Sequence, residues 1–455
     1  MQIPASLVHS VKRLNGRAVW LTMLSLFSAF LSAPAAETSW PQFRGPAGDG
    51  HAAVEAKVPL EFGEQQGLVW KQPITGTGWS SPVIADGRIW VTTAETSEAT
   101  EEQIAAALKV DPKNDTKTIA GNIVLSVVCL DAATGEVLLQ RTLAHVESPD
   151  PIHATNSFAS PTPTLHDGRV YCHFGTYGTW CLDAQTGETV WENRIPLIHS
   201  VGPGSSPVLV RNRLLLVCDG VDDQFIVALD PATGKQLWRT ERPPMRAPDG
   251  DQQKAYSTPL LITVDGREQA VIPGAQWTCA YDPVDGTELW RVDHGRGFST
   301  VPMAVYEQGL VIFATGFMQA ELVAVDPTGS GDVTATHIKW RMKRQAPTKP
   351  SPLGHGGRVY TISDNGVFCC TDVATGEVLY QKRVPGKYSA SPLLAGGHLF
   401  LGNHEGVVTI IRPGAEFEQV FETQLDGQMM ASPAVIEDDL IIRTADYLYR
   451  FTARD

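Results

Sequence analysis

One repeated unit runs along the chain, and it limits the possible folds more than any other feature does. A Ser-Pro or similar pair precedes an apolar run eight times, and most pairs are spaced by 40 to 52 residues. That spacing is the length of one four-stranded propeller blade. The pairs are Ser81-Pro82, Ser160-Pro161, Ser206-Pro207, Thr258-Pro259, Val301-Pro302, Ser351-Pro352, Ser391-Pro392 and Ser432-Pro433.

Each unit also repeats its turns. An Asp-Gly or Gly-Gly dipeptide, which reaches positive φ cheaply, leads into an alternating strand. The third strand ends in an Asp-x-x-Thr-Gly run, in which the Asp can accept backbone N–H bonds and the Gly closes the turn. One carboxylate per repeat indicates architecture rather than catalysis. The clearest copies are Asp131–Gly135, Asp183–Gly187, Asp230–Gly234 and Asp372–Gly376.

The units predict an all-β fold, an eight-bladed β-propeller of four-stranded antiparallel blades. The eighth unit stops after a third strand, and Leu68–Lys71 has the pattern of the missing fourth strand. We therefore expect an N-terminal strand to complete the last blade and remove exposed sheet edges. The expected propeller spans 68–455, after an N-terminal extension at 36–67. An insertion at about 95–122 in blade 1 is expected to be a surface decoration.

The first 35 residues resemble an export signal. Lys12, Arg13 and Arg17 precede an apolar stretch of about 16 residues, which is shorter than the roughly 20 needed to span a bilayer. Ala33-Pro34-Ala35 offers a cleavage site. Removing this segment takes the formal net charge from −14 to −17, which disfavours nucleic-acid binding. We expect a periplasmic or extracellular protein with no membrane span in its mature chain.

The seven cysteines are mostly explained by the repeat. Cys and Ala alternate at one position two residues before the turn Asp, as expected of a small buried hydrophobe. One disulfide remains open, because Cys172 and Cys181 flank the turn at Gly175–Gly178 and could be cross-strand neighbours.

The Asp-x-x-Thr-Gly-x-x-x-Trp pattern resembles the repeat of pyrroloquinoline-quinone (PQQ)-type propellers, from about Trp40 to Arg450. The opening Trp40–Pro46 is similar to that of secreted PQQ-like propellers of planctomycete-type bacteria. The resemblance implies the propeller fold and two kinds of function. Some members oxidise alcohols with PQQ and Ca²⁺, whereas the outer-membrane assembly lipoprotein is a scaffold without cofactor.

The dehydrogenase alternative requires parts that the sequence does not clearly supply. In those enzymes a disulfide between adjacent cysteines lies over the cofactor. Cys369-Cys370 is the adjacent pair here, but it lies within an ordinary third strand, where successive side chains point to opposite faces. No residue is assigned a catalytic or metal-binding role, and His51, His145 and His153 are taken as surface residues.

Residues just before each pair are the default ligand-binding candidates, because loops before the innermost strands crowd one mouth of a propeller channel. We expect an exported, non-catalytic binding or scaffold propeller that recognises a protein or small ligand there. The alternative is a PQQ- and calcium-dependent dehydrogenase acting on alcohols or sugars. A propeller coupled to a hydrolase or kinase-like partner is a third possibility. The candidate residues are Trp79, Asn156, Tyr256, Phe298, Lys349, Lys387 and Tyr388, with Phe158 and Met429 beside them.

Overall fold

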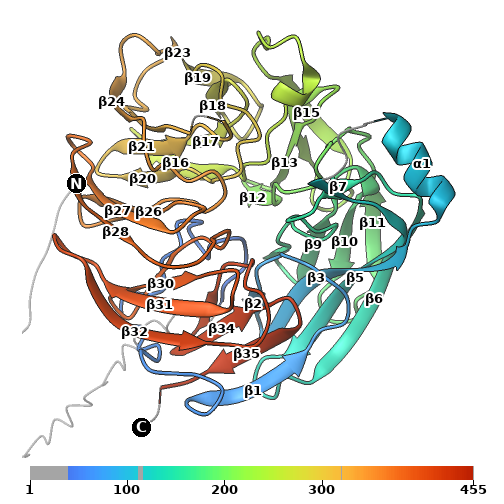
Figure 1. Ribbon diagram of the computed structural model, residues 1–455. Coiled ribbons are helices and arrows are strands. Elements are labelled where there is room, and N and C mark those ends of the chain that lie inside the picture. Colours follow the sequence, from blue (N-terminus) through green and yellow to red (C-terminus); the bar gives the residue numbers. More distant parts are fainter. Residues whose placement is uncertain (1–38, 111–115, 319, 454–455) are drawn as a thin grey trace, which may run out of the picture. The chain divides into compact units, whose positions relative to one another are not determined.

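The computed structural model describes residues 39–110, 116–318 and 320–453. The export signal expected at 1–35 lies outside these residues. The described part forms eight four-stranded antiparallel blades around a central channel, which confirms the expected propeller (Figure 1). Within the described residues no helix is long and apolar enough to cross a membrane.

Each blade begins with a short strand next to the channel and ends with a strand at the rim. Blade 1 consists of β2 (Val83–Ala85), β3 (Arg88–Glu98), β5 (Ala120–Asp131) and β6 (Val137–Glu147), and blade 2 consists of β8 (Thr164–His166), β9 (Arg169–His173), β10 (Thr179–Asp183) and β11 (Thr189–Asn193). Blade 3 consists of β12 (Val208–Val210), β13 (Arg213–Asp219), β14 (Gln224–Leu229) and β15 (Gln236–Glu241), and blade 4 consists of β16 (Leu260–Val264), β17 (Arg267–Pro273), β18 (Trp277–Tyr281) and β19 (Glu288–Asp293).

Blades 5 to 8 follow the same order. Blade 5 consists of β20 (Val305–Glu307), β21 (Leu310–Ala314), β22 (Leu322–Val325) and β24 (Ile338–Met342), and blade 6 consists of β25 (Leu353–His355), β26 (Arg358–Ile362), β27 (Val367–Asp372) and β28 (Val378–Arg383). Blade 7 consists of β29 (Leu393–Ala395), β30 (His398–Gly402), β31 (Val407–Arg412) and β32 (Glu418–Gln424), and blade 8 consists of β33 (Ala434–Ile436), β34 (Asp439–Arg443), β35 (Tyr447–Phe451) and β1 (Leu68–Pro73). A short strand, β23 (Gly331–Asp332), adds a fifth, parallel member to blade 4.

The ring closes as the repeat predicts. Strand β1 pairs antiparallel with β35, with Lys71 opposite Tyr449, so early sequence supplies the outer strand of the last blade. The ammonium of Lys71 also lies 2.9 Å from the carboxylate of Glu64, just before β1. Within the described residues every blade therefore has at least four strands, and β1 supplies the outer strand of blade 8.

The Asp-x-x-Thr-Gly run is a joint between neighbouring blades. In blade 1, Asp131 Oδ1 accepts a hydrogen bond from the backbone N–H of Thr134 at 2.8 Å, and Gly135 has a φ of +75°. A Cβ on Gly135 would lie 2.6 Å from the ring of Trp70, whose indole N–H donates to the carbonyl of Ala132 at 3.0 Å. The repeated Asp and Gly thus seat the large outer-strand side chain of the preceding blade.

The segment 39–53 lies in the channel and is held by the innermost strands of blades 1, 2, 6 and 7. Two of its contacts are isolated β-bridges, to β2 and to β29. Further hydrogen bonds reach blades 2 and 6, which lie opposite each other in a ring of eight, so this N-terminal segment crosses and closes the channel. Its hydrogen bonds join Trp40 with Ile84, Pro41 with Leu165, Gly50 with Leu394, and His51 with Gly354.

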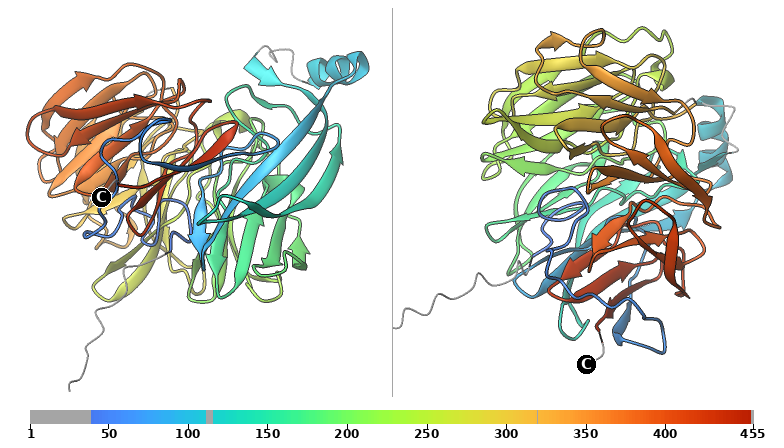
Figure 2. Two further views of the ribbon diagram at one scale, coloured as in Figure 1. Left: turned by 90° about the horizontal axis from the view of Figure 1, so that it is seen from below. Right: turned by 90° about the vertical axis from the view of Figure 1, so that its left-hand side faces the viewer.

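The blade 1 insertion carries a helix, α1 (Glu101–Val110), at the far end of the long strands β3 and β5 (Figure 2). After residues 111–115, which are outside the described part, β4 (Lys117–Thr118) pairs antiparallel with β7 (Ile152–His153). That pairing brings the end of the insertion back to the channel mouth, so the insertion is more than the surface decoration that its sequence suggested.

Candidate functional site

A cavity of about 880 Å³ opens at the channel mouth, on the side from which the chain enters each innermost strand. All eight blades contribute residues to it, and the end of the insertion adds Thr116 and Lys117. Phe43 of the N-terminal segment also lines it. The cavity is therefore a blind funnel, open at the mouth and closed within the channel by the segment 39–53.

Five of the seven candidate residues lie together in this cavity, namely Trp79, Asn156, Tyr256, Phe298 and Lys349. The other two, Lys387 and Tyr388, are not among the residues that line it. Their assignment to a ligand-binding role remains a prediction in every case.

Blade 7 presents other residues to the cavity, Ser389 and Ser391. The ring of Tyr388 is fully buried in the core between blades 6 and 7, and its hydroxyl donates to the carbonyl of Pro385 at 3.0 Å. Lys387 is exposed. Phe158 and Met429 are likewise buried, and Met430 reaches the cavity instead. Alternation along an extended backbone explains these shifts by one residue, which move a side chain from one face to the other.

Seven hydroxyl residues form a hydrogen-bonded ring at the base of the cavity. At seven of the eight blade junctions, a backbone N–H donates to the Oγ of a Ser or Thr in the next blade. We call these seven residues the hydroxyl crown; all of them line the cavity. The bonds run from Ser81 to Thr162 at 2.9 Å, Thr162 to Ser206 at 2.9 Å, Ser206 to Thr258 at 3.0 Å, Met303 to Ser351 at 3.0 Å, Ser351 to Ser391 at 2.9 Å, Ser391 to Ser432 at 2.9 Å, and Ser432 to Ser81 at 3.1 Å.

The crown explains the repeated pairs and corrects two of them. Each crown residue precedes a proline, which contributes no N–H of its own and keeps the preceding residue extended. In blade 2 the equivalent pair is Thr162-Pro163 rather than Ser160-Pro161. In blade 5 it is Met303-Ala304 rather than Val301-Pro302, and Met303 has no hydroxyl to accept a bond from blade 4.

A buried ammonium lies in the wall of the cavity. The side chain of Lys254 is 3% exposed and forms an ion pair with Asp251, whose carboxylate also accepts a bond from Ser200 Oγ at 3.0 Å. Burial lowers the pKa of Lys254. Burial would raise the pKa of Asp251, but its contacts with Lys254 hold that pKa below the usual value. Sequence reasoning missed Lys254, because nothing local distinguishes it from a surface lysine.

Two further basic side chains, Lys349 and His153, line the cavity. The ammonium of Lys349 is 3.6 Å from the carboxylate of Asp364. His153, which the sequence placed at the surface, lines the cavity beside β4. Burial lowers the pKa of His153, and the nearby charges of Lys349 and Lys117 lower it further. The mouth near His153 therefore has a positive potential.

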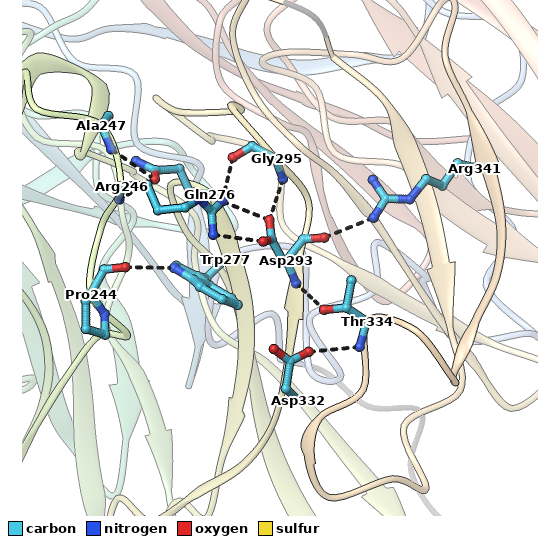
Figure 3. Close-up of polar contacts among 10 residues, drawn as sticks. All are labelled: Pro244, Arg246, Ala247, Gln276, Trp277, Asp293, Gly295, Asp332, Thr334 and Arg341. Atoms are coloured by element: carbon cyan, nitrogen blue, oxygen red, sulfur yellow. Dashed lines mark hydrogen bonds and ion pairs between the residues drawn. The ribbon is translucent and has the colours of Figure 1, made fainter.

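The loop 243–255 carries Asp251 and Lys254 to the cavity, and a polar cluster anchors it (Figure 3). Both carboxylate oxygens of Asp293 accept bonds from the guanidinium of Arg246 at 2.8 Å. The same guanidinium stacks 4.9 Å from the ring of Trp277. These contacts fix the start of the loop against the outer strands of blade 4.

Asp293 is itself held from blade 5 (Figure 3). Its N–H donates to Thr334 Oγ1 at 2.8 Å, and its carbonyl accepts from Arg341 Nη2 at 3.0 Å. Asp332 in β23 in turn accepts the N–H of Thr334 at 3.1 Å. The extra strand β23 thus supports the loop that lines the cavity.

A buried ion pair at the end of β15 ties the same loop to the interior. Arg242, directly after β15, donates to both oxygens of Asp219 at 3.0 and 2.7 Å, and both side chains are at most 1% exposed. The carbonyl of Asp219 accepts the N–H of Ala255 at 3.1 Å, where the loop returns. A buried bidentate ion pair therefore closes the base of the loop.

All seven cysteines lie in the described part of the chain, and all are free and buried. Cys172 pairs with Trp180 across the sheet, and Cys181 pairs with Tyr171. Cross-strand partners share a face, so Cys172 and Cys181 point to opposite faces and cannot be bridged. Cys369 and Cys370 are consecutive in β27 and also face opposite sides.

Residues 39–110, 116–318 and 320–453 contain no group of three or more His, Cys, Asp or Glu side chains placed to hold a metal ion. Three carboxylates line the cavity and are engaged one at a time: Asp249 accepts the backbone N–H of Asp251 at 3.0 Å, Asp251 pairs with Lys254, and Asp364 is bound by the loop that contains Lys349.

Curated relatives match parts of the chain. The outer membrane protein assembly factor BamB of Shewanella oneidensis is 22% identical over 308 residues, covering 62% of this chain and 71% of the relative. A tetrathionate hydrolase of Acidithiobacillus ferrooxidans is 30% identical over 176 residues, which are 37% of this chain and 30% of the hydrolase. The chain therefore spans less than a third of that hydrolase.

Two solved structures share the fold. BamB from Moraxella catarrhalis aligns with a TM-score of 0.56 at 15% identity, over 85% of this chain and 97% of BamB. A quinohemoprotein alcohol dehydrogenase from Comamonas testosteroni aligns with a TM-score of 0.60 at 12% identity, over 92% of this chain and 82% of the enzyme. The family model described as outer membrane protein assembly factor BamB matches residues 109–262 and 274–413, well over half of the sequence. This chain, with its PQQ-like propeller repeats, therefore belongs to the family of the outer membrane protein assembly factor BamB.

Proposed function

We propose that this chain is an exported, non-catalytic binding propeller whose funnel receives a small ligand or a segment of a partner protein. The observation that carries the proposal is the blind cavity of about 880 Å³, lined from all eight blades and closed within by the segment that contains Phe43. Pockets of this size and mostly apolar lining are typical of ligand sites. A relative named as an outer membrane protein assembly factor supports a role in binding proteins.

The walls of the funnel suit recognition of a ligand that is both apolar and polar. Trp79, Tyr256 and Phe298 offer ring faces and edges, which bury a large area with little loss of side-chain freedom. Lys254 and Lys349 add positive charge. Each lysine is already paired with a carboxylate, so the charges are held in place before a ligand arrives.

The alternative, a PQQ- and calcium-dependent dehydrogenase, fits the cavity less well. Calcium needs six to eight oxygen ligands. Asp249 and Asp251 come from the loop before blade 4 and Asp364 from blade 6. Asp249 accepts a backbone N–H, and the other two are engaged by lysines and hydroxyls, so the described residues form no common ligand group. Cys369 and Cys370 lie in a strand of blade 6 and do not line the cavity. These contacts favour binding without this cofactor.

One experiment separates the two functions. PQQ and Ca²⁺ are added to the purified protein, and the absorbance spectrum, the melting temperature and dye-linked oxidation of 1-butanol are measured. We expect none of the three to change. A bound chromophore together with alcohol oxidation would overturn the proposal and establish the dehydrogenase.

A further inference from the structure

The break in the hydroxyl crown divides the funnel into two unlike sides. In blade 5, Met303 replaces the hydroxyl residue, and Phe298, Val301 and Phe317 of the same blade line the cavity beside it. The rings of Phe298 and Phe317 meet edge to face at 5.7 Å, and Phe43 packs against the core cluster that contains Met303. We call Phe43, Phe298, Val301 and Phe317 the apolar wall.

The other side of the funnel presents hydroxyl donors. Each crown Oγ accepts a backbone N–H from the preceding blade. Within the described residues, none of the seven crown hydroxyls donates to a protein acceptor, so their protons are available to the cavity that they line. A hydroxyl that accepts a hydrogen bond becomes a better donor through polarisation. The crown is therefore an arc of polarised O–H donors without partners.

Basic side chains line the same cavity, and the ammonium of Lys254 lies 5.7 Å from the ring of Phe298 on the apolar wall. Lys254 projects from the blade 4 loop, Lys349 from the blade 6 loop and Lys117 from the insertion, and all three line the cavity. Lys117 and Lys349 both lower the pKa of His153, which places their positive potential inside the mouth. Donor hydroxyls and ammonium groups in one cavity favour an anionic oxygen ligand over a cation or a donor.

We infer that the hydroxyl crown is a subsite for a carboxylate, and that the apolar body attached to the carboxylate lies against the apolar wall. This inference rests on the proposed function, since it names the chemistry recognised by the same funnel. A carboxylate on an apolar body can be the C-terminus of a polypeptide or a free organic acid. Both place acceptor oxygens on the crown, so the experiment must distinguish the two sources.

The direct test uses matched pairs of ligands and needs no mutation. Binding of 3-phenylpropionate and 3-phenylpropanamide to the full chain is measured by isothermal titration calorimetry. The same measurement compares the tripeptide Ala-Ala-Phe as free acid and as C-terminal amide. We expect each acid to bind at least tenfold more tightly than its amide. Tighter binding of the peptide acid identifies a polypeptide terminus as the source, and tighter binding of the small acid identifies a free organic acid.

Variants then locate the subsite. Ser391→Ala combined with Ser432→Ala removes two neighbouring crown hydroxyls on the side away from the apolar wall, and should weaken binding of the acid tenfold or more. Ser391→Thr keeps a hydroxyl and should retain affinity. Ser257→Ala is the matched control: it removes a buried hydroxyl that donates to Pro302 at 2.8 Å but does not line the cavity.

The outcomes distinguish a failure of the carboxylate subsite from a failure of the binding funnel. If acids and amides bind equally and the crown variants bind like the wild type, the carboxylate subsite is overturned while the binding funnel stands. If neither acid nor amide binds to the wild type, the carboxylate subsite is overturned and the proposed funnel loses its support. The comparison of acid with amide in the wild type tests the carboxylate subsite even if the double variant fails to fold.

Discussion

The two ends of the channel are built by different means. At the closed end, the N-terminal segment is fixed by backbone hydrogen bonds to strands of blades 1, 2 and 7 and by the His51 side chain to blade 6, and Trp40 is only 2% exposed. At the open end, side chains form the surface, and the protons of the crown hydroxyls have no hydrogen-bond acceptor among the described residues. The contrast shows that backbone hydrogen bonds hold the closed end together, whereas the crown hydroxyls face a cavity where a ligand or water can reach them.

The largest effect is expected at the closed end. Trp40→Ala should cost about 3–5 kcal/mol of unfolding free energy, because it removes a buried indole whose ring lies against the turn at Gly45. Chemical denaturation measures the change. Val54→Ala, directly after the segment 39–53 and 96% exposed, is the control and should leave stability unaltered. A loss below 1 kcal/mol for Trp40→Ala would show that the segment is not a structural part of the ring.

Low pH should destabilise the fold around His294, which directly follows β19 of blade 4 near the open end. Burial lowers the pKa of His294 to about 4, and its side chain lies beside the loop anchor at Asp293. Unfolding returns the pKa to its ordinary value near 6.5, so the contribution is complete above that pH and is lost as the pH falls from about 6.5 to 4. The loss is about 3 kcal/mol, at about 1.4 kcal/mol per pKa unit.

The melting temperature is therefore measured against pH for the wild type and for His294→Gln. The variant should show a flatter curve between pH 6.5 and 4, because its side chain binds no proton in either state. His166→Gln, at a half-exposed histidine, should leave the curve unchanged. Parallel curves for the wild type and His294→Gln would contradict the assignment.

A smaller global effect is expected from the loop anchor. Arg246→Ala removes a bidentate bond to Asp293, but both side chains are more than a third exposed, so the cost should be about 1 kcal/mol or less. The local effect should be larger. Amide hydrogen exchange in 247–254 should accelerate, while exchange in the innermost strands stays slow. Arg211→Ala, which breaks an exposed pair with Glu268, is the control.

The smallest effect on stability and the clearest effect on binding are expected from two lysines. Lys349→Glu reverses a charge that lines the cavity, whereas Lys387→Glu reverses one that does not. Both should change unfolding free energy by about 0.5 kcal/mol or less, as surface substitutions usually do. Only Lys349→Glu should weaken binding of 3-phenylpropionate. Equal losses for the two variants would mean that long-range charge, rather than the funnel wall, attracts the ligand.

Repetition made most of the fold predictable, but it did not fix the register of every unit. Ser160-Pro161-Thr162-Pro163 contains two candidate pairs two residues apart, and both lie on one face of an extended strand. The bond from Ser81 to Thr162 selects the second pair. In blade 5, Met303 conceals the equivalent position, because it lacks the hydroxyl that marks the others.

The candidate site was predictable where it follows the repeat. Trp79, Tyr256 and Lys349 precede an innermost strand and reach the cavity as expected. Lys117 and Phe43 were missed, since each arrives from outside the repeats. Their positions depend on pairing between β4 and β7 and on the path of the N-terminal segment, and neither leaves a periodic signal in the sequence.

The sequence by itself determined the number of blades, their turns and the closure of the ring. The number of blades and the turns follow from a short pattern that recurs in each unit, and the closure follows from the outer-strand pattern at Leu68–Lys71, which precedes the first unit. Tertiary structure alone decided that one end of the channel is closed and that donors surround the other. The bond between Gly50 and Leu394 joins residues more than three hundred positions apart, and the crown exists only when eight separate units meet. Such contacts depend on the whole ring, and no local pattern encodes them.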